Sequence, residues 1–407
     1  MEVLHARCAG LDVHKDSVVA CVRIASGSKV NRETATFGTT TSQLIALSEW
    51  LKQSGVTHVA MEATGVYWKP VWHILEESFT LLLGNARRMR NVPGRKSDVN
   101  DANWIADLLA HGLIEPSFVP DRPIQELRDL TRTRKQLVRV AADASNRLQK
   151  VLEDANIKLG SLLSDVMGPS GRAIIDAIIT GETDPQRLAA LGSTRLKATP
   201  AQLREALRGR ITEHHRFMLA MHLQHYDQTQ QMVERIDARI EELGHPFVDA
   251  VERLVEVPGI SRTAAFTLVS EIGVDMGRFE RPQRLVSFAG VCPRLEESAG
   301  KKKSTRARRA GTWLKTIAVT CGWAAARTKK SYFRAQFQRI KARRGPTKAV
   351  IAVASSLMTV VFFVLRGRRF VDVGDAYFDR LNRERTARRL RKRIEALGYS
   401  VTIQPAA

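Results

Sequence analysis

Residues 10–24 read GLDVHKDSVVACVRI, and residues 56–64 read VTHVAMEAT. Each stretch contains a β-branched run, which is typical of strands, next to an acidic residue. Asp12 precedes the run in the first stretch, and Glu62 follows it in the second. Residues 42–54 have the apolar spacing of an amphipathic helix, and a second helix is predicted at residues 67–77. Strands that alternate with helices predict a mixed α/β domain in which helices flank a sheet. The predicted strands are residues 18–24, 34–37, 56–61 and 80–84.

From residue 101 onward the sequence predicts helices almost throughout. Pro120 and Pro123 mark a boundary, because proline interrupts a helical pattern. Long helices are predicted at residues 124–157 and 201–243, with shorter helices and loops between them. The second long helix carries a seven-residue spacing that indicates a coiled-coil seam, although packing within its own domain would also explain it. The spaced residues are Ile211, Met218, His225 and Met232, continued by Ile236, Ile240 and Leu243.

The net charge of +22 is concentrated near the C-terminus. Residues 1–110 hold 12 Lys/Arg against 11 Asp/Glu, and residues 111–289 hold 24 against 24. Residues 290–407 hold 28 against 7, which is a net charge of +21. A field this localised favours nucleic acid as partner, with an anionic membrane or a solvated basic face as alternatives. Aromatic residues in the same stretch can stack on bases: Trp313, Trp323, Tyr332 and Phe333.

Several other classes of protein do not fit the composition. The four cysteines are scattered without a CxxC pair, so neither a zinc site nor a disulfide framework is indicated. The N-terminus lacks the pattern of a signal peptide. The apolar run at residues 349–365 contains Ser355, Ser356 and Thr359, and we interpret it as a buried core helix and not as a membrane span. We therefore expect a cytosolic protein.

Four carboxylates stand where secondary structure can bring them together. Asp12 lies in GLDVHK at the start of the first strand, and Glu62 closes the strand that ends at residue 61. Asp98 and Asp101 are three residues apart in KSDVNDA at a helix start, so they share one helix face. Two strand-end carboxylates that face a helix-borne pair predict a divalent-metal site for phosphodiester chemistry, with two ions about 3.5–4 Å apart.

Each carboxylate also has an ordinary structural explanation. Asp98 can be a helix cap, which the helix dipole favours, and Asp12 can be a turn residue. Other acidic residues in the same domain are interpreted as surface groups, namely Asp16, Glu76 and Asp107. The combination of four carboxylates in a domain of near-zero net charge, joined to a strongly basic region, favours the metal site.

Two segments of the last third are candidates for contact with nucleic acid. Residues 257–260, VPGI, join predicted helices as in a helix-hairpin-helix, where Gly259 would let backbone N–H groups approach a phosphate. A plain structural turn is an equal alternative. Further on, Ser298 is followed by six cations that could stabilise its alkoxide: Lys301, Lys302, Lys303, Arg306, Arg308 and Arg309. By composition, Ser304 is placed as well as Ser298.

These motifs are similar, in order and spacing, to those of the DEDD transposases of the IS-one-ten (IS110) insertion-sequence family. The resemblance runs from about residue 9 to residue 366 and rests on GLDVHK, MEATGVYW, KSDVNDA, VPGI, AGVCPRLEESAGK and the basic segment that follows. It implies an RNase H-like domain of the RuvC type, whose metal-binding tetrad matches Asp12, Glu62, Asp98 and Asp101. The expected ion is Mg²⁺ or Mn²⁺.

The resemblance also implies how the last third works. Ser298 matches a serine that attacks DNA and forms a transient 5′-phosphoserine link, and its Glu-Ser-x-Gly context favours it over Ser304. A coiled-coil segment would join the two domains and support a dimer or tetramer. The implied partners are double-stranded donor and target DNA and a structured guide RNA, in the bacterial cytoplasm at the nucleoid. The tetrad and the serine can act within one chain or across subunits.

We therefore expect four parts. Residues 1–120 form the RuvC-like domain, residues 121–245 the helical linker and coiled coil, residues 246–373 the helical transposase domain with the serine, and residues 374–407 a basic tail. The roles of residues 160–200 and of the tail stay open, because both look longer than a minimal family member needs. Two alternatives remain: a RuvC-like structure-selective nuclease that uses water as nucleophile, and a non-catalytic nucleic-acid-binding relative.

Overall fold

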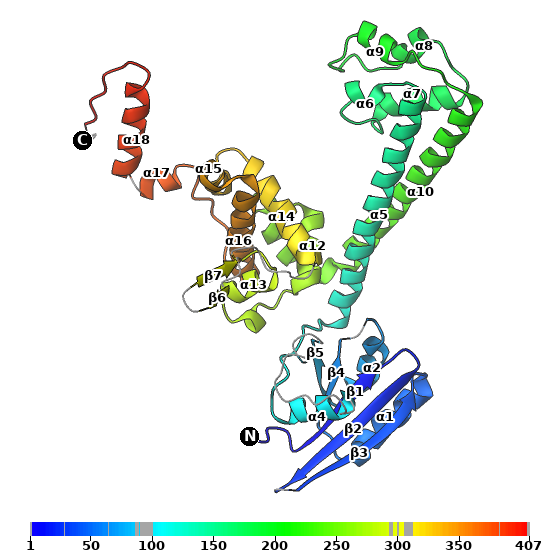
Figure 1. Ribbon diagram of the computed structural model, residues 1–407, viewed down its shortest axis with the longest axis vertical. Helices are drawn as coiled ribbons and strands as arrows, with labels where there is room; N and C mark the ends of the chain where they lie inside the picture. The colour runs from blue at the N-terminus through cyan, green and yellow to red at the C-terminus, as the bar shows by residue number, and fades with distance from the viewer. Residues whose placement is uncertain are drawn as a thin grey trace. The chain divides into compact units, whose positions relative to one another are not determined.

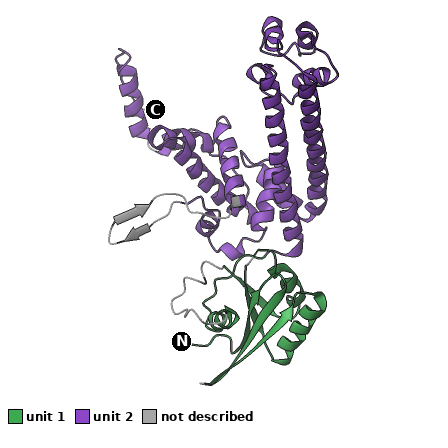
Figure 2. Ribbon diagram, turned by 45° about the vertical axis from the view of Figure 1, so that its right-hand side comes forward, with its two compact units in different colours: residues 1–119 green, residues 120–407 purple. Residues whose placement is uncertain are grey.

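The computed structural model describes residues 2–27, 29–63, 65–85, 89, 101–292, 296–298, 301–304, 312–381 and 383–404, with the backbone alone for residues 296–298, 301–304 and 312. The chain divides into two compact units, Met1–Val119 and Pro120–Ala407 (Figure 2). Within the described residues, the first unit contains a five-stranded sheet, and the second is helical apart from one two-stranded hairpin.

The sheet of the first unit has the strand order β3-β2-β1-β4-β5 (Figure 1). Its central strand β1 pairs antiparallel with β2 and parallel with β4, and β4 pairs parallel with β5. The exposed edge strand β3 carries Lys29, Arg32 and Glu33, and charged residues at an edge discourage pairing with another chain. The strand bounds are β1 Arg7–Val13, β2 Ser17–Ser26, β3 Lys29–Gly38, β4 His58–Glu62 and β5 Thr80–Gly84.

Helices cover both faces of this sheet. The helices α1 (Thr41–Gln53) and α2 (Trp68–Leu75) pack their leucines against one face. The helix α4 (Asp101–Ala110) packs against the other face, over Cys8 and Ala60. The central strand is therefore covered on both sides, and its residues Cys8–Leu11 are all buried. The predicted mixed α/β character of the first unit is confirmed.

The second unit begins with two long helices that lie side by side and antiparallel, α5 (Arg122–Asp154) and α10 (Glu213–Leu243) (Figure 1). At one end, Leu127 of α5 and Ile240 of α10 enter the core of the C-terminal helices. At the other end, both helices pack with four short helices around a separate core. These are α6 Leu159–Leu162, α7 Pro169–Ile179, α8 Pro185–Ala190 and α9 Pro200–Ala206.

The prediction of one helix over residues 201–243 was wrong, because the chain breaks between α9 and α10. At Gly209 a Cβ atom would lie 2.3 Å from the carbonyl oxygen of Ala155, so this glycine lets the chain cross the end of α5. The hydroxyl of Thr212 then caps α10 by accepting from the backbone N–H of His215, at 3.3 Å. A capped helix start of this kind begins a new helix.

The predicted seam on α10 was also wrong in part. Met232 is 50% exposed, whereas Val233 is only 6% exposed. The buried stripe on α10 includes Leu219, Leu223, Val233 and Ile240, so the predicted seam was wrong at Met218, His225 and Met232 and right at Ile240. Helix α5 packs against these buried residues of α10. The large apolar residues at positions 218 and 232 led the sequence-based prediction to a different stripe.

The C-terminal helices pack around α16 (Pro346–Leu365), which contacts α11, α13, α14 and α15. The surrounding helices are α11 Val248–Val255, α12 Arg262–Ile272, α13 Pro282–Phe288, α14 Thr312–Arg327 and α15 Tyr332–Arg344, with short 3-10 turns at His245–Phe247 and Gly277–Phe279. By length and composition α16 could cross a membrane. Its apolar side chains instead form the centre of this core, as the sequence predicts.

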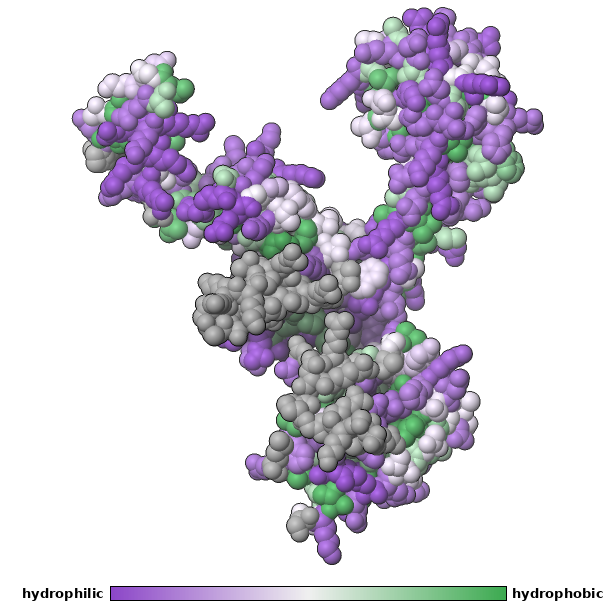
Figure 3. Space-filling view, viewed as in Figure 1, coloured by the Kyte–Doolittle hydropathy of each residue, from purple (hydrophilic) through white to green (hydrophobic). Residues whose placement is uncertain are grey.

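The chain ends in two exposed helices, α17 (Tyr377–Leu381) and α18 (Arg383–Glu395). Helix α17 is held to α15 by aromatic contacts: Phe378 stacks on Tyr332, and the guanidinium of Arg339 lies 5.1 Å from the Phe378 ring. The described residues of α18 include no buried side chain, and the helix presents a mostly hydrophilic surface (Figure 3).

Candidate active site and nucleic-acid surface

Asp12 and Glu62 lie side by side at the ends of neighbouring parallel strands. The register pairs Leu11 with Met61, so the next residues along β1 and β4 are these two carboxylates. Asp12 was predicted at the start of the first strand, but it lies near the end of β1. The sequence analysis missed β1 because its residues are mostly small, RCAGLDV, and have low strand propensity.

Both carboxylates lie on the face of the sheet that α4 covers. Side chains alternate between faces along a strand, and Leu11 and Met61 belong to the core on the opposite face. Cys8 and Ala60, which have the same parity as Asp12 and Glu62, pack beneath α4. The Asp12 side chain is 21% exposed, and its Oδ2 lies 3.2 Å from Nε2 of His14. His14 was not among the predicted site residues, although it lies only two positions after Asp12 in the sequence.

Gly10 allows α4 to lie directly on the central strand. A Cβ atom at this position would lie 2.3 Å from the carbonyl oxygen of Ala102 and 2.3 Å from the backbone nitrogen of Ala106. Ala102 also packs with Val19, which is the cross-strand partner of Asp12. Asp101, the first residue of α4, therefore begins the helix close to the Asp12 end of β1.

Asp98 lies outside the described residues, so the structure places three of the four predicted ligands. Among the described residues, no group of three His, Cys, Asp or Glu side chains is close enough to hold a metal ion. The structure thus brings together Asp12 and Glu62, with Asp101 at the adjoining helix start. Carboxylate oxygens are the donor type that suits Mg²⁺, and a metal site formed by these residues stays a prediction.

A buried ion-pair cluster fixes α4 on the sheet. Arg23 is only 3% exposed, and its Nε donates to Oδ1 of Asp107 at 2.9 Å. Arg32 donates to the same carboxylate at 2.9 and 3.1 Å. Asp107, which was interpreted as a surface group, is 28% exposed and in addition pairs with two arginines, whereas Asp16 and Glu76 are exposed as predicted. A charged residue inside the apolar run at residues 18–24 signalled that Arg23 needs a partner.

The thiol of Cys8 is also held beneath α4. Its Sγ donates to the carbonyl oxygen of Ala106 at 3.6 Å. Burial raises the pKa of the Cys8 thiol to about 11, so the side chain stays protonated at neutral pH. Cys8 is therefore a packing residue.

The VPGI turn joins α11 to α12 as predicted, but its glycine is explained by packing. Gly259 has a φ of +92°, and a Cβ atom there would lie 2.5 Å from the backbone nitrogen of Ala325 and 2.6 Å from the carbonyl oxygen of Cys321. Helix α14 thus occupies the side where a side chain would project. The hydroxyl of Ser261 caps α12. This geometry favours the structural turn, and a phosphate contact at Gly259 stays a prediction.

The serine segment contains a β-hairpin that the sequence analysis did not predict. Its strands are β6 (Glu296–Ser298) and β7 (Lys301–Ser304). In the register of the hairpin, Ser298 pairs with Lys301 and Ser304 pairs with Glu296. One candidate serine is therefore opposite a lysine and the other is opposite a glutamate. Lys302 and Lys303 continue β7. Arg306, Arg308 and Arg309 lie outside the described residues.

Two family models match the chain. A DEDD transposase model of the IS110 type matches residues 9–157, which include the four carboxylates. The model described as "Transposase IS116/IS110/IS902 family" matches residues 251–338, which include Gly259 and Ser298. Together these ranges cover more than half of the chain.

The chain belongs to the IS110 family of transposases. It is therefore an enzyme of DNA strand cleavage and transfer. Transposases act on DNA and commonly assemble into oligomers, and those of the DEDD type typically need a divalent metal. None of the proteins with curated functions matches this transposase significantly.

Proposed function

We propose that this transposase cuts and rejoins DNA through a covalent link to Ser298, with Asp12, Glu62, Asp98 and Asp101 as the ligands of a divalent ion. The observation that carries the carboxylate part is the register of β1 and β4, which brings Asp12 beside Glu62. On this proposal the first unit, Met1–Val119, is an RNase H-like domain of the RuvC type, consistent with its strand order and with the antiparallel pairing of β1, β2 and β3.

The carboxylates would hold Mg²⁺, or Mn²⁺ in its place. When bound, such an ion supplies positive charge against the scissile phosphate. The protein's own contribution is to fix the ligands. The sheet sets the spacing of Asp12 and Glu62, while the Gly10 contact and the Arg23–Asp107 pair set the position of the helix that begins at Asp101.

The Ser298 hydroxyl would attack the phosphorus of one DNA strand. A bond forms between Oγ and phosphorus, and the bond from phosphorus to the 3′ oxygen breaks. The hydroxyl proton leaves Ser298, and the departing 3′ oxygen gains one, so the step needs no further reactant. The energy of the phosphodiester is conserved in the 5′-phosphoserine ester, which a DNA hydroxyl can attack in a later rejoining step. Lysine at position 301, opposite Ser298 in the hairpin, supports this site because a cation favours the developing negative charge.

The nucleic-acid partners follow from charge and from the family resemblance. Residues 290–407 carry a net charge of +21, which supports contact with phosphates, and the cations at positions 301–303, 306, 308 and 309 are the proposed first contacts. A structured guide RNA that pairs with donor and target DNA rests on the resemblance. The same holds for assembly into a dimer or tetramer and for action at the bacterial nucleoid.

Trapping the covalent adduct tests this proposal. Protein, guide RNA and donor DNA incubated with Mg²⁺ should give a denaturant-resistant adduct, with the phosphate ester on the peptide that contains Ser298. Ser298→Ala removes only the attacking oxygen, so this variant should assemble and form no adduct. Ser304→Ala is the matched control and should keep the adduct.

The rival nuclease gives the opposite pattern. If water is the nucleophile, cleavage survives in Ser298→Ala and no variant forms an adduct. An adduct on Ser304 would keep the covalent mechanism and move the nucleophile. If the wild-type protein binds DNA yet neither cleaves it nor forms an adduct under any of these conditions, the chain is a non-catalytic relative.

A further inference from the structure

A pocket of about 490 Å³ lies within the second unit between α5, α12 and α14. Its volume falls in the usual range for small-ligand sites, about 300–1,000 Å³. Apolar side chains of α14 and hydroxyl groups from Ser261, Thr267 and Thr320 line it, and α5 contributes cations. None of these residues belongs to the carboxylate site or to the serine hairpin.

Trp313 forms the aromatic wall of this pocket, at the start of α14. The guanidinium carbon of Arg132 lies 5.4 Å from the centre of its ring, and Nζ of Lys135 lies 5.3 Å from the same point. These distances are typical of cation–π contacts. Because residues 132 and 135 are three apart on α5, both cations project from one face of that helix toward Trp313.

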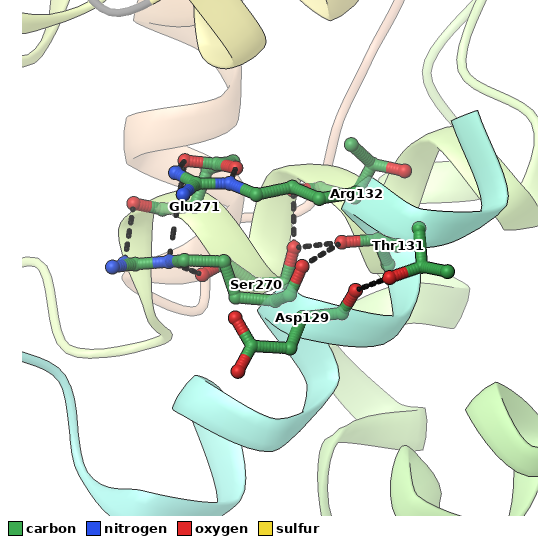
Figure 4. A network of polar contacts seen from close by, with 8 residues as sticks. Asp129, Thr131, Arg132, Ser270 and Glu271 are labelled. Carbon is green, nitrogen blue, oxygen red and sulfur yellow. Dashed lines mark hydrogen bonds and ion pairs between the residues drawn. The ribbon is translucent and has the colours of Figure 1, made fainter. Parts of the chain in front are cut away.

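Arg132 is held rigidly in this wall. Its Nε and Nη2 donate to the two carboxylate oxygens of Glu271 at 2.7 and 2.9 Å, and the Glu271 side chain is only 8% exposed. Figure 4 shows Arg132 beside Glu271. Neighbouring Arg128 donates to the backbone carbonyl oxygens of Ser270 and Glu271. The hydroxyls of Thr131 and Ser270 share a hydrogen bond of 2.9 Å. The pocket wall is therefore preorganised, because this network joins α5 to α12.

Lys135 differs from Arg132 in having no carboxylate within ion-pair distance among the described residues. Its side chain is half-buried, and burial together with nearby Arg139 lowers its pKa. A half-buried ammonium that lies among other cations is stabilised by an anion that enters the pocket. The pocket thus offers an ammonium group that makes no ion pair among the described residues, a fixed guanidinium, an indole and several hydroxyls.

We propose that this Trp313 pocket binds one unpaired nucleotide of the DNA or RNA that the transposase handles. The phosphate would lie at Lys135 and Arg132, and the base would pack against Trp313 and hydrogen-bond to the pocket hydroxyls. Aromatic side chains beside cations are the usual means of binding single-stranded nucleic acid. Strand exchange produces unpaired nucleotides, which gives such a pocket a role in holding a displaced strand.

Binding of a single-stranded oligonucleotide with a central 2-aminopurine tests this inference. The full-length protein is titrated without divalent metal, so the result does not depend on the carboxylate or serine chemistry. Trp313→Leu should lower affinity roughly tenfold and remove the quenching of 2-aminopurine, because the base loses its stacking partner. Lys135→Gln should weaken binding several-fold and reduce the slope of log affinity against log salt by about 0.7, the value for one lost phosphate contact on a single strand.

Two matched variants outside the pocket control for charge and packing. Lys150→Gln removes an exposed lysine from the same helix, about 22 Å further along at 1.5 Å per residue. Phe217→Leu makes a comparable aromatic change on α10, at a side chain that is 62% exposed. Both should bind like the wild type.

Parallel arms identify the strand and can overturn the inference. Single-stranded DNA, single-stranded RNA and duplex versions of one sequence are compared. A loss of affinity in Trp313→Leu that is confined to one of the single strands supports the pocket and identifies its ligand. If the loss of affinity is as large on the duplex, or if Lys150→Gln and Phe217→Leu lose as much affinity, the pocket does not bind an unpaired nucleotide. If Trp313→Leu also lowers the thermal midpoint, Lys135→Gln decides: an unchanged salt slope in that variant contradicts the inference.

Discussion

At the scale of single residues, the carboxylates differ in what surrounds them. Asp12 and Glu62 lie on the α4 face of the sheet and are partly buried, whereas Asp16 is exposed only four positions after Asp12. Asp16 therefore supplies a matched control for Asp12 in the same segment. Substitution of a site residue should affect catalysis without affecting folding, because the fold positions its carboxylate and does not depend on it for stability.

Replacement of each proposed ligand by alanine should reduce strand cleavage about a hundredfold or more, since a lost electrostatic contact in the transition state has this magnitude. The variants are Asp12→Ala, Glu62→Ala, Asp98→Ala and Asp101→Ala. Nucleic-acid binding and the thermal midpoint should stay near wild type, and Asp16→Ala should cleave normally. Cleavage by two or more of the four variants at near wild-type rates would show that the metal-site proposal is wrong.

At the scale of elements, α4 is fixed by a charge pair that the sheet buries. Asp107→Leu leaves the Arg23 guanidinium, 3% exposed, without its carboxylate. Breaking a buried pair in this way should lower the free energy of unfolding by about 3 kcal/mol, and cleavage should fall as Asp101 loses its position. Glu49→Leu, which breaks the exposed pair with Lys52, should cost under about 1 kcal/mol. Equal costs in chemical denaturation would rule out this anchoring role.

The register of the α5–α10 pair can be tested with two neighbouring residues. Val233→Ala removes methyl groups from the buried stripe and should lower the free energy of unfolding by about 1–2 kcal/mol. Met232→Ala acts at a side chain that is 50% exposed and should change it by about 0.5 kcal/mol or less. Urea titrations measure both. The reverse order would restore the seam that the seven-residue spacing predicted.

At the scale of the whole molecule, the basic tail adds charge without adding core. Residues 374–407 hold eight Lys/Arg and four Asp/Glu, and the described residues of α18 include no buried side chain. Truncation after Val373 removes this charge together with the contacts of Phe378 on Tyr332, so it should lower the thermal midpoint only slightly. It should also weaken binding to duplex DNA and reduce the salt slope by about 0.9 for each phosphate contact that is lost.

A substituted tail separates charge from length. Replacement of Arg388, Arg389, Arg391 and Lys392 by glutamine keeps the chain and should reproduce most of the loss of slope. An unchanged slope in both the truncated and the substituted protein would mean that the tail contacts no phosphate and binds protein instead.

The sequence by itself determined the features that depend on local pattern and charge. Alternation of strands and helices predicted the α/β character of the first unit, and the apolar run at residues 349–365 predicted the core helix α16. The clustering of basic residues favoured a nucleic-acid partner, and the family followed from motifs in order. These features can be read from sequence because they depend on residue type and on spacing along one chain.

Only the tertiary structure decided which distant residues meet. The strand β1 escaped prediction because its small residues are buried by helices from elsewhere in the chain. The seam of α10 differs from the predicted one at Met218 and Met232 because α5, and not local periodicity, determines which side chains are covered. Asp107 meets Arg23, and Arg132 and Lys135 meet Trp313, across separations that no motif encodes. Long-range packing sets these contacts, and it is a property of the folded chain as a whole.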